Sequence, residues 1–214
     1  DFKGLNEEGI PTFINESGEL TTSDINFQER DRKGHLIYEG STDPTITGSF
    51  GNIFTYKALK LNVFITYSFG NVVRLDPQFH NKYTDLDATP KEFKNRWMKS
   101  GDENRTNIPA IADARMNTQD TYLSRAYNAY NYSTVRTAKG DFIRMKEISL
   151  SYDLPKTWLS HLKLSTASLK LQATNLFLIY SDDKLNGQDP EFFNTGGVAV
   201  PVPKQFTLTL RLGI

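Results

Sequence analysis

The feature that most constrains the fold is the alternation of apolar and polar residues in several segments. The cleanest segment is the last, from Gln205 to Ile214. Its apolar positions are Phe206, Leu208, Leu210, Leu212 and Ile214. A period of two places alternate side chains on opposite faces of a strand, whereas a helix repeats about every 3.6 residues. The chain therefore ends in a predicted strand with one apolar face.

Two further segments with this pattern, Thr45 to Lys57 and Leu61 to Phe69, are separated only by residues 58–60. So short a connection predicts a hairpin. Its apolar positions are Ile46, Phe50, Phe54 and Tyr56 in the first strand, and Leu61, Val63, Ile65, Tyr67 and Phe69 in the second.

A third segment, Phe142 to Leu154, is less regular, because Arg144 and Lys146 fall on the same predicted face as Phe142 and Ile148. Pro155 ends it, since proline lacks the N–H that a ladder requires. A short link containing Trp158 and His161 leads to the next alternating segment, from Ala167 to Ile179. The chain is therefore predicted to be all-β, with five antiparallel strands.

The connections between these strands are short at 58–60 and 156–163 and long at 76–140 and 181–203. Short turns at one end and long loops at the other are typical of an outer-membrane β-barrel, and they place the C-terminus at the short-turn, periplasmic end. A soluble antiparallel sandwich would show the same alternation. Five strands cannot close a transmembrane barrel, for which about eight is the minimum. If the barrel interpretation holds, the chain is a fragment or a split subunit that pairs with further chain.

Composition excludes some classes of protein and leaves others open. Lys and Arg number 25, as do Asp and Glu, so the zero net charge argues against a nucleic-acid partner. The sequence has no run of about 18 apolar residues, so no membrane-spanning helix is predicted. Membrane-spanning β-strands do not require such a run, because only alternate residues face the lipid. The start at Asp1, without Met, a basic segment or an apolar segment, suggests a mature or cleaved piece.

No enzymatic, metal or cofactor site is predicted. The chain has no Cys, and His35, His80 and His161 lie far apart without ligand spacing. Asp85-Leu86-Asp87 and Asp182-Asp183 offer carboxylates but lack the spacing of a calcium loop, so solvated acids are the simpler interpretation. There is neither a nucleophile elbow nor a phosphate loop.

The long loops carry the candidate contacts to a ligand or partner, because aromatic side chains in loops often serve recognition. These candidates are Trp97, Tyr122, Tyr127, Tyr130, Tyr132, Phe192 and Phe193. Packing within the loops is the competing explanation, and Trp97 could instead anchor its own helix to the barrel rim. That helix is predicted over 90–99, with Thr89 as N-cap and Pro90 first, and a second short helix is predicted over 110–116.

Two other groups of residues have predicted roles. Tyr56, Tyr67 and Tyr152 lie near the strand ends on the apolar faces, where aromatic girdles contact the membrane interface. Asp189-Pro190-Glu191 and Gly140-Asp141 are either ligand contacts or turns that set the strand ends, and the turn interpretation is favoured.

Spaced motifs along essentially the whole chain resemble one family. They are Gly4-Leu5-Asn6, Gly40-Ser41, Thr47-Gly48-Ser49-Phe50, Phe54-Thr55-Tyr56-Lys57, Asn95-Arg96-Trp97, Gly140-Asp141-Phe142-Ile143-Arg144-Met145-Lys146, Leu150-Ser151-Tyr152-Asp153-Leu154-Pro155, Asn175-Leu176-Phe177, Gly187-Gln188-Asp189-Pro190-Glu191 and Pro203. In this order they resemble the C-terminal end of the SusC/RagA-type TonB-linked outer-membrane transporters of the Bacteroidetes. Ile214 departs from the aromatic residue that commonly ends such barrels. The family's plug domain, TonB box and most of its barrel have no counterpart in this sequence.

The resemblance implies the C-terminal part of a large barrel of the roughly 22-stranded type. It divides the chain into an extracellular segment (1–44), a barrel hairpin (45–75), a long extracellular loop (76–140), a second barrel hairpin (141–180), an extracellular loop (181–203) and a closing strand (204–214). It implies an outer-membrane location and import of glycans or peptides.

The partners implied are the rest of the barrel and plug, a SusD-like surface lipoprotein, TonB through the missing N-terminal part, and outer-membrane lipid. Two alternatives stay open. One is a soluble all-β carbohydrate-binding module, and the other is a non-transporting structural barrel subunit of an envelope assembly.

Overall fold

A computed structural model describes residues 1–28, 31, 33–84, 86–119, 122–193 and 203–214. The chain forms two compact units. The first comprises Asp1–Gly40 and Arg74–Ala138, and the second comprises Ser41–Val73 and Lys139–Ile214. No helix among the described residues is long and apolar enough to cross a membrane.

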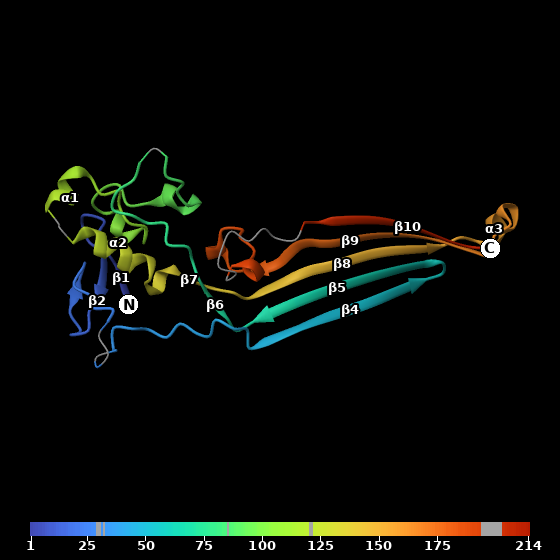
Figure 1. The fold of residues 1–214 in the computed structure, drawn as a ribbon, viewed down its shortest axis with the longest axis horizontal. Coiled ribbons are helices and arrows are strands. Elements are labelled where there is room, and N and C mark those ends of the chain that lie inside the picture. Colours follow the sequence, from blue (N-terminus) through green and yellow to red (C-terminus); the bar gives the residue numbers. More distant parts are fainter. Residues whose placement is uncertain (29–30, 32, 85, 120–121, 194–202) are drawn as a thin grey trace. The chain divides into compact units, whose positions relative to one another are not determined.

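The second unit is built on a 5-stranded sheet in the order β10-β9-β8-β5-β4 (Figure 1). Its strands are β4 (Ile46–Tyr56), β5 (Leu59–Phe69), β8 (Phe142–Asp153), β9 (Thr166–Ser181) and β10 (Gln205–Gly213). Every neighbouring pair is antiparallel. The predicted all-β fold is confirmed.

The hairpin of β4 and β5 turns earlier than the sequence predicts. Tyr56 already pairs with Leu59, so the turn consists of Lys57 and Ala58. Lys57 has a φ of 54°, in the left-handed region that such tight turns require. Leu59 and Lys60, predicted as turn residues, belong to β5.

The predicted short link between β8 and β9 contains a helix, α3 (Lys156–Leu162). Pro155 precedes it as N-cap, and Lys163 ends it with a φ of 56°. The β4–β5 turn, α3 and the C-terminus lie at the same end of the sheet (Figure 1). After the opposite end of β9 come two short 3-10 helices, η4 (Asp183–Leu185) and η5 (Pro190–Phe192).

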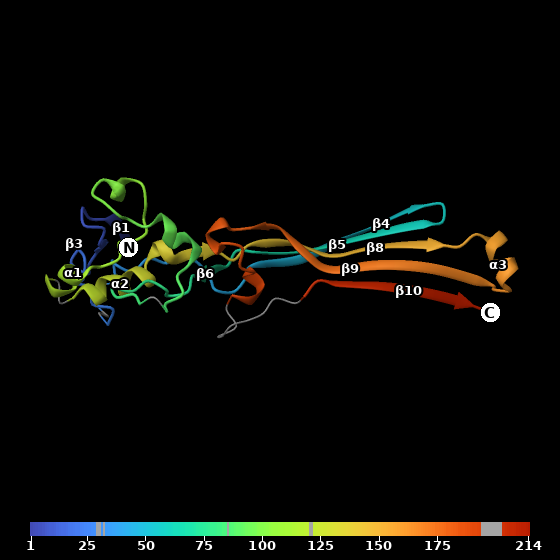
Figure 2. The same cartoon turned by 90° about the horizontal axis from the view of Figure 1, so that it is seen from above.

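The first unit contains a small 3-stranded sheet and several short helices (Figure 2). The strands are β1 (Phe2–Leu5), β2 (Pro11–Ile14) and β3 (Leu20–Thr21). The helices are η1 (Lys91–Asn95), η2 (Asp102–Asn104), α1 (Ala114–Gln119), α2 (Leu123–Asn131) and η3 (Thr134–Arg136). Two short strands, β6 (Val72–Arg74) and β7 (Thr137–Lys139), pair with each other where the chain passes between the units.

The core of the first unit is rich in aromatic rings. Its fully buried side chains include Phe13, Phe79, Leu123, Tyr127 and Tyr130. The rings of Phe79 and Tyr130 meet edge to face with centroids 5.0 Å apart. Such packing accounts for many of the aromatic residues in the long 76–140 segment, which is a folded part of this unit rather than a simple loop.

The two helix predictions in this segment are wrong in detail. The helix predicted over 90–99 is the 3-10 helix η1, its N-cap is Pro90 instead of Thr89, and no side chain caps it. It ends early because Arg96 is extended and the Trp97 amide donates to the Ile108 carbonyl at 3.0 Å.

The helix predicted over 110–116 begins instead at Ala114. The Ala110 amide donates to the Gly9 carbonyl at 3.0 Å, which holds this residue outside any helix. The longest helix of the unit, α2, was not predicted.

Candidate functional site

The large sheet has one apolar face. Residues directly opposite each other in antiparallel strands lie on the same face, and the register places Phe54, Leu61, Leu150, Leu171 and Leu208 in one row across all its strands. These side chains are exposed, with 53% of Leu171 and 69% of Leu208 accessible. An ordinary soluble protein rarely exposes so continuous an apolar surface.

The opposite face of the same sheet is polar and carries opposed charges. Lys60 and Asp153 form an ion pair at 3.3 Å. Glu147 accepts a hydrogen bond from Asn62 at 3.3 Å and lies 3.8 Å from the Lys170 ammonium. One face is therefore suited to lipid and the other to water, as in the wall of a transmembrane barrel.

A β-bulge in β8 explains why its alternation is irregular. Phe64 pairs with Glu147 and Ile65 with Met145, which leaves Lys146 as the extra residue. One extra residue in a strand moves every following side chain to the opposite face of the sheet. Met145 therefore continues the apolar face, and the prediction that Arg144 lies on that face is wrong.

Arg144 is instead buried in an ionic cluster on the polar face. Its guanidinium contacts the Asp189 carboxylate and lies 3.2 Å from that of Glu191. Only 7% of the Arg144 side chain and 10% of the Asp189 side chain are accessible. Asp189 also accepts from the Glu191 amide at 3.1 Å, as the N-cap of η5.

Other carboxylates at this end of the sheet also hold backbone amides. Asp141 accepts from the Gly70 amide at 2.7 Å, and Asp182 accepts from those of Lys139 at 2.8 Å and Lys184 at 2.9 Å. These contacts support the turn interpretation of Gly140-Asp141 and Asp189-Pro190-Glu191, because each carboxylate is already engaged within the fold.

Two glycines of β4 make room for aromatic rings of β5, one on each face. A Cβ atom at Gly48 would lie 2.6 Å from Cζ of Tyr67, and one at Gly51 would lie 3.0 Å from Cδ2 of Phe64. Both rings therefore lie flat across the neighbouring strand. Tyr67 also stacks on Phe69, with centroids 5.7 Å apart.

The three predicted girdle residues fall in two rows on the apolar face. Tyr56 and Tyr152 both flank Leu59, at the short-turn end. Tyr67 lies in the row of position 48, with Tyr180 two strands away. The stretch from position 48 to Tyr56 measures about 27 Å at about 3.4 Å per residue. An apolar band about 25 Å tall between aromatic rows is typical of outer-membrane barrels, and the girdle role stays a prediction.

Two of the predicted contact residues, Tyr127 and Tyr130, lie in the core of the first unit with 1% of each accessible. They cannot touch a ligand there, so this part of the prediction is corrected in favour of packing. The Tyr127 hydroxyl donates to the Ala110 carbonyl. Burial raises the pKa of both hydroxyls well above the usual range for tyrosine.

Trp97 is half-buried and has a structural role in the first unit. Its ring occupies the space beside Gly9, where a Cβ atom would lie 2.5 Å from it. Its indole N–H donates to Glu103 at 3.0 Å, and this hydrogen bond is the main cause of a lowered pKa of the Glu103 carboxyl.

The remaining contact candidates are accessible. Tyr122 and Tyr132 are each about half exposed, at 53% and 51%. Arg125 lies over the Tyr122 ring at 4.7 Å, and Arg74 over the Tyr132 ring at 5.8 Å. Phe192 and Phe193 are half-buried beside η5. Much of the predicted 181–203 loop, residues 194–202, lies outside the described residues, as does Asp85.

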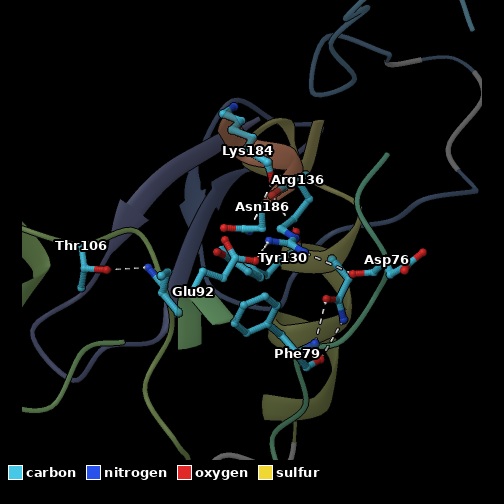
Figure 3. A network of polar contacts seen from close by, with 11 residues as sticks. Asp76, Phe79, Glu92, Thr106, Tyr130, Arg136, Lys184 and Asn186 are labelled. Atoms are coloured by element: carbon cyan, nitrogen blue, oxygen red, sulfur yellow. Dashed lines mark hydrogen bonds and ion pairs between the residues drawn. The ribbon is translucent and has the colours of Figure 1, made fainter. Parts of the chain in front are cut away.

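A buried arginine that the sequence did not single out organises the first unit (Figure 3). Arg136 is 3% exposed, forms an ion pair with Glu92 at 2.5 Å and donates to the Asp76 carbonyl at 3.2 Å. Its guanidinium lies 4.8 Å from the centre of the Phe79 ring. Arg136 thereby joins η1 to the segment that follows β6, and no sequence motif indicates this role.

A cavity of about 130 Å³ lies in the first unit, bounded by β2, the 35–39 segment and the end of α2. His35 lines it and is 3% exposed, and neither of its ring nitrogens has a hydrogen-bond partner among the described residues. Among the described residues, no three His, Asp or Glu side chains gather as metal ligands would.

Comparisons with known proteins agree with this architecture, although no established family profile matches the chain. TonB-dependent receptor P39 of Formosa agariphila is 26% identical over 213 residues, covering 91% of this chain and 19% of that protein. TonB-dependent receptor P3 of the same organism is 25% identical over 158 residues, covering 71% and 13%. The chain thus spans about a fifth or less of the length of these curated relatives.

Among solved structures, the RagAB peptide importer in the open-open state matches with a TM-score of 0.66 and 19% identity, covering 100% of this chain and 22% of that one. The RagAB peptide transporter matches with a TM-score of 0.66 and 21% identity, covering 99% and 22%. At this identity the likeness shows the fold.

The fold and the two-faced sheet are those of the wall of an outer-membrane β-barrel, and the sequence is similar to part of TonB-dependent receptors. Its motifs resemble those of the C-terminal region of the SusC/RagA family, and the similarity to TonB-dependent receptors and the fold shared with RagAB support that resemblance.

Proposed function

We propose that the chain supplies barrel wall and loops to a SusC-like transporter that imports glycans or peptides across the outer membrane. In this proposal the apolar face of the large sheet meets lipid, and the polar face lines the lumen. The long segments 76–140 and 181–203 form the extracellular surface, where a SusD-like lipoprotein docks. TonB acts through parts of the transporter that this sequence does not contain.

The observation that carries the proposal is the exposed apolar row from Phe54 to Leu208 on a sheet whose other face is charged. A soluble protein would bury such a row or make it polar. The strand order ends at β4 and β10, so the outer edge of each pairs with no strand among the described residues. Open edges in lipid are costly, which supports pairing with further barrel strands.

The alternative of a soluble carbohydrate-binding module accounts poorly for this surface. A sugar platform requires a few exposed rings, whereas here an exposed row from Phe54 to Leu208 crosses every strand of the sheet. A non-transporting barrel subunit would have the same two faces. Uptake therefore has to be measured to separate it from a transporter.

The membrane assignment is tested with single-cysteine variants of the full-length transporter that contains this chain, with any other cysteines removed, in lipid nanodiscs. Leu171→Cys and Gln172→Cys place nitroxide labels at adjacent positions on opposite faces. We expect the label at 171 to be accessible to oxygen and shielded from a water-soluble nickel complex. The label at 172 should show the reverse, and equal nickel accessibility at both positions would refute the lipid face.

Transport is tested in cells that carry the full transporter with its lipoprotein partner. Labelled oligopeptides and oligosaccharides are offered with and without a functional TonB system. We expect TonB-dependent uptake of one of these two substrate classes. Correct assembly in the membrane without energised uptake of either would favour the structural subunit.

A further inference from the structure

The helix α3 is short, exposed and basic. Trp158 is 60% exposed, while its neighbour Leu159 is 6% exposed and holds the helix to the sheet. Lys156, His161 and Lys163 are all exposed. No acidic residue lies between positions 156 and 163, and the nearest one before them, Asp153, is already paired with Lys60.

The position of α3 relates it to the apolar face. It contacts β9 and joins β8 to β9 at the short-turn end, beyond the row that contains Tyr56 and Tyr152 (Figures 1 and 2). Ala167, on the apolar face of β9, is only 6% exposed, whereas Leu212 opposite it is 57% exposed. The apolar face is thus more buried at Ala167, near the start of β9, than at Leu212 on the neighbouring strand.

We propose that α3 is an interfacial anchor that binds the headgroups of anionic phospholipids at the short-turn end of the barrel. This proposal rests on the proposed function, because it requires the apolar face to lie in lipid. Trp158 is then placed at headgroup depth, where the amphipathic indole ring is favoured. The two lysines face the phosphates, because an anionic membrane surface attracts basic side chains.

Two features of α3 point to lipid as the occupant. Helix α3 lies beyond the row of Tyr56 and Tyr152 at the short-turn end of the sheet, and Lys156 and Lys163 give it a charge complementary to phosphate. Further barrel strands would pair at β4 and β10, the ends of the strand order, whereas α3 follows β8 in the middle of the sheet. A contact to the plug or to a second copy would exclude lipid from the helix and is an outcome of the test.

The test uses the full-length transporter in nanodiscs, with His161→Cys carrying a nitroxide label. Position 161 lies one turn after Trp158, on the same side of the helix, and leaves Trp158 and both lysines intact. Labels at 171 and 172 are measured in parallel. We expect the label at 161 to lie at a depth between the label at 171, in lipid, and the label at 172, in water. It should also be several-fold less accessible to the nickel complex than the label at 172.

The charge contribution is tested by the double variant Lys156→Gln/Lys163→Gln. In nanodiscs with anionic lipid it should raise nickel accessibility at 161 several-fold, and it should have little effect in zwitterionic lipid. The matched control is Lys91→Gln/Lys94→Gln, which removes two exposed lysines from η1 in the first unit and should change nothing.

Suppose that the label at 171 lies in lipid. The anchor alone would then be overturned if the label at 161 were fully accessible to the nickel complex, or if it were shielded from both nickel and oxygen. A label at 171 that lies in water would instead overturn the proposed function. An insensitivity of position 161 to the lysine variant in anionic lipid would refute the phosphate contact.

Discussion

Arg144 of β8 and Asp189 of the loop after β9 form a nearly buried ion pair across 45 residues of sequence. The pair joins a strand of the barrel wall to the start of the final loop. Because Asp189 also caps η5, one arginine fixes both the path of the loop and the start of its second 3-10 helix.

Replacement of Arg144 by Met should strongly destabilise the transporter. It leaves Asp189 buried without its counter-charge, which typically costs about 3–5 kcal/mol. The measurement is the temperature at which the folded barrel loses its anomalous gel mobility. Lys60→Met is the control, because the Lys60–Asp153 pair is about half exposed and worth about 0–1 kcal/mol. Equal effects of the two variants would contradict the importance of the buried pair.

Deletion of Lys146 should be far more damaging than its replacement. Without the bulge, Arg144 moves to the apolar face near the Tyr67 row, where lipid disfavours its charge, and its pair with Asp189 is lost. Lys146→Ser preserves the register and should assemble normally. The readout is the fraction of folded barrel in the outer membrane, and a deletion variant that assembles like wild type would disprove the face exchange.

The buried tyrosines predict loss of stability in alkali. Burial raises the pKa of Tyr127 and Tyr130 above the ordinary value of 10.0, because the neutral hydroxyl is favoured in the folded state. Their contribution is complete below pH 10 and is lost as the pH rises from there through the folded pKa. Ultraviolet absorbance should show exposed tyrosines ionising first and these two ionising only on unfolding.

The variant Tyr127→Phe separates the hydroxyl from the ring. It leaves the Ala110 carbonyl without its donor, at a cost of about 1–3 kcal/mol at neutral pH. It should also remove part of the alkaline loss. Tyr122→Phe, at an exposed ring, is the control. An alkaline transition of unchanged depth in Tyr127→Phe would count against the role of the buried hydroxyl.

Glu103 predicts an effect at acidic pH. Its pKa is lowered chiefly by the hydrogen bond from Trp97, so this contribution is present at neutral pH and is lost as the pH falls below the usual glutamate range through the lowered pKa. In a transporter whose other tryptophans are replaced, Trp97 fluorescence should change over that interval. Glu103→Gln should abolish the titration, and its persistence would show that another group is responsible.

The sheet was predictable because its pattern arises from local alternation. In the segments that end at Phe69, Ile179 and Ile214, apolar residues recur at every second position over many residues. This pattern is typical of a strand with one apolar and one polar face. The early half of β8 was not predictable, since the bulge at Lys146 reverses the phase. A single sequence does not indicate which residue of a strand is the extra one in a β-bulge.

The first unit was less accessible to sequence analysis. Tyr127 and Tyr130 lie on a polar helix, and the Tyr130 ring packs against residues as distant in sequence as Phe2 and Phe79. Arg136 similarly acquires its role only when Glu92 is brought beside it. Long-range packing of this kind overrides local propensity, which explains why the predicted site retained exposed Tyr122 and Tyr132 but lost the two buried rings.

The two glycines of β4 imply an unusual pattern of mutational tolerance. Positions 48 and 51 are at or near the accessible surface, and a rule based on exposure would accept almost any residue there. The rings of Tyr67 and Phe64 already occupy the space above them, on opposite sides of the strand. In a saturation library, selection should therefore reject even alanine at Gly48, while the exposed neighbour Ile53 accepts several apolar replacements.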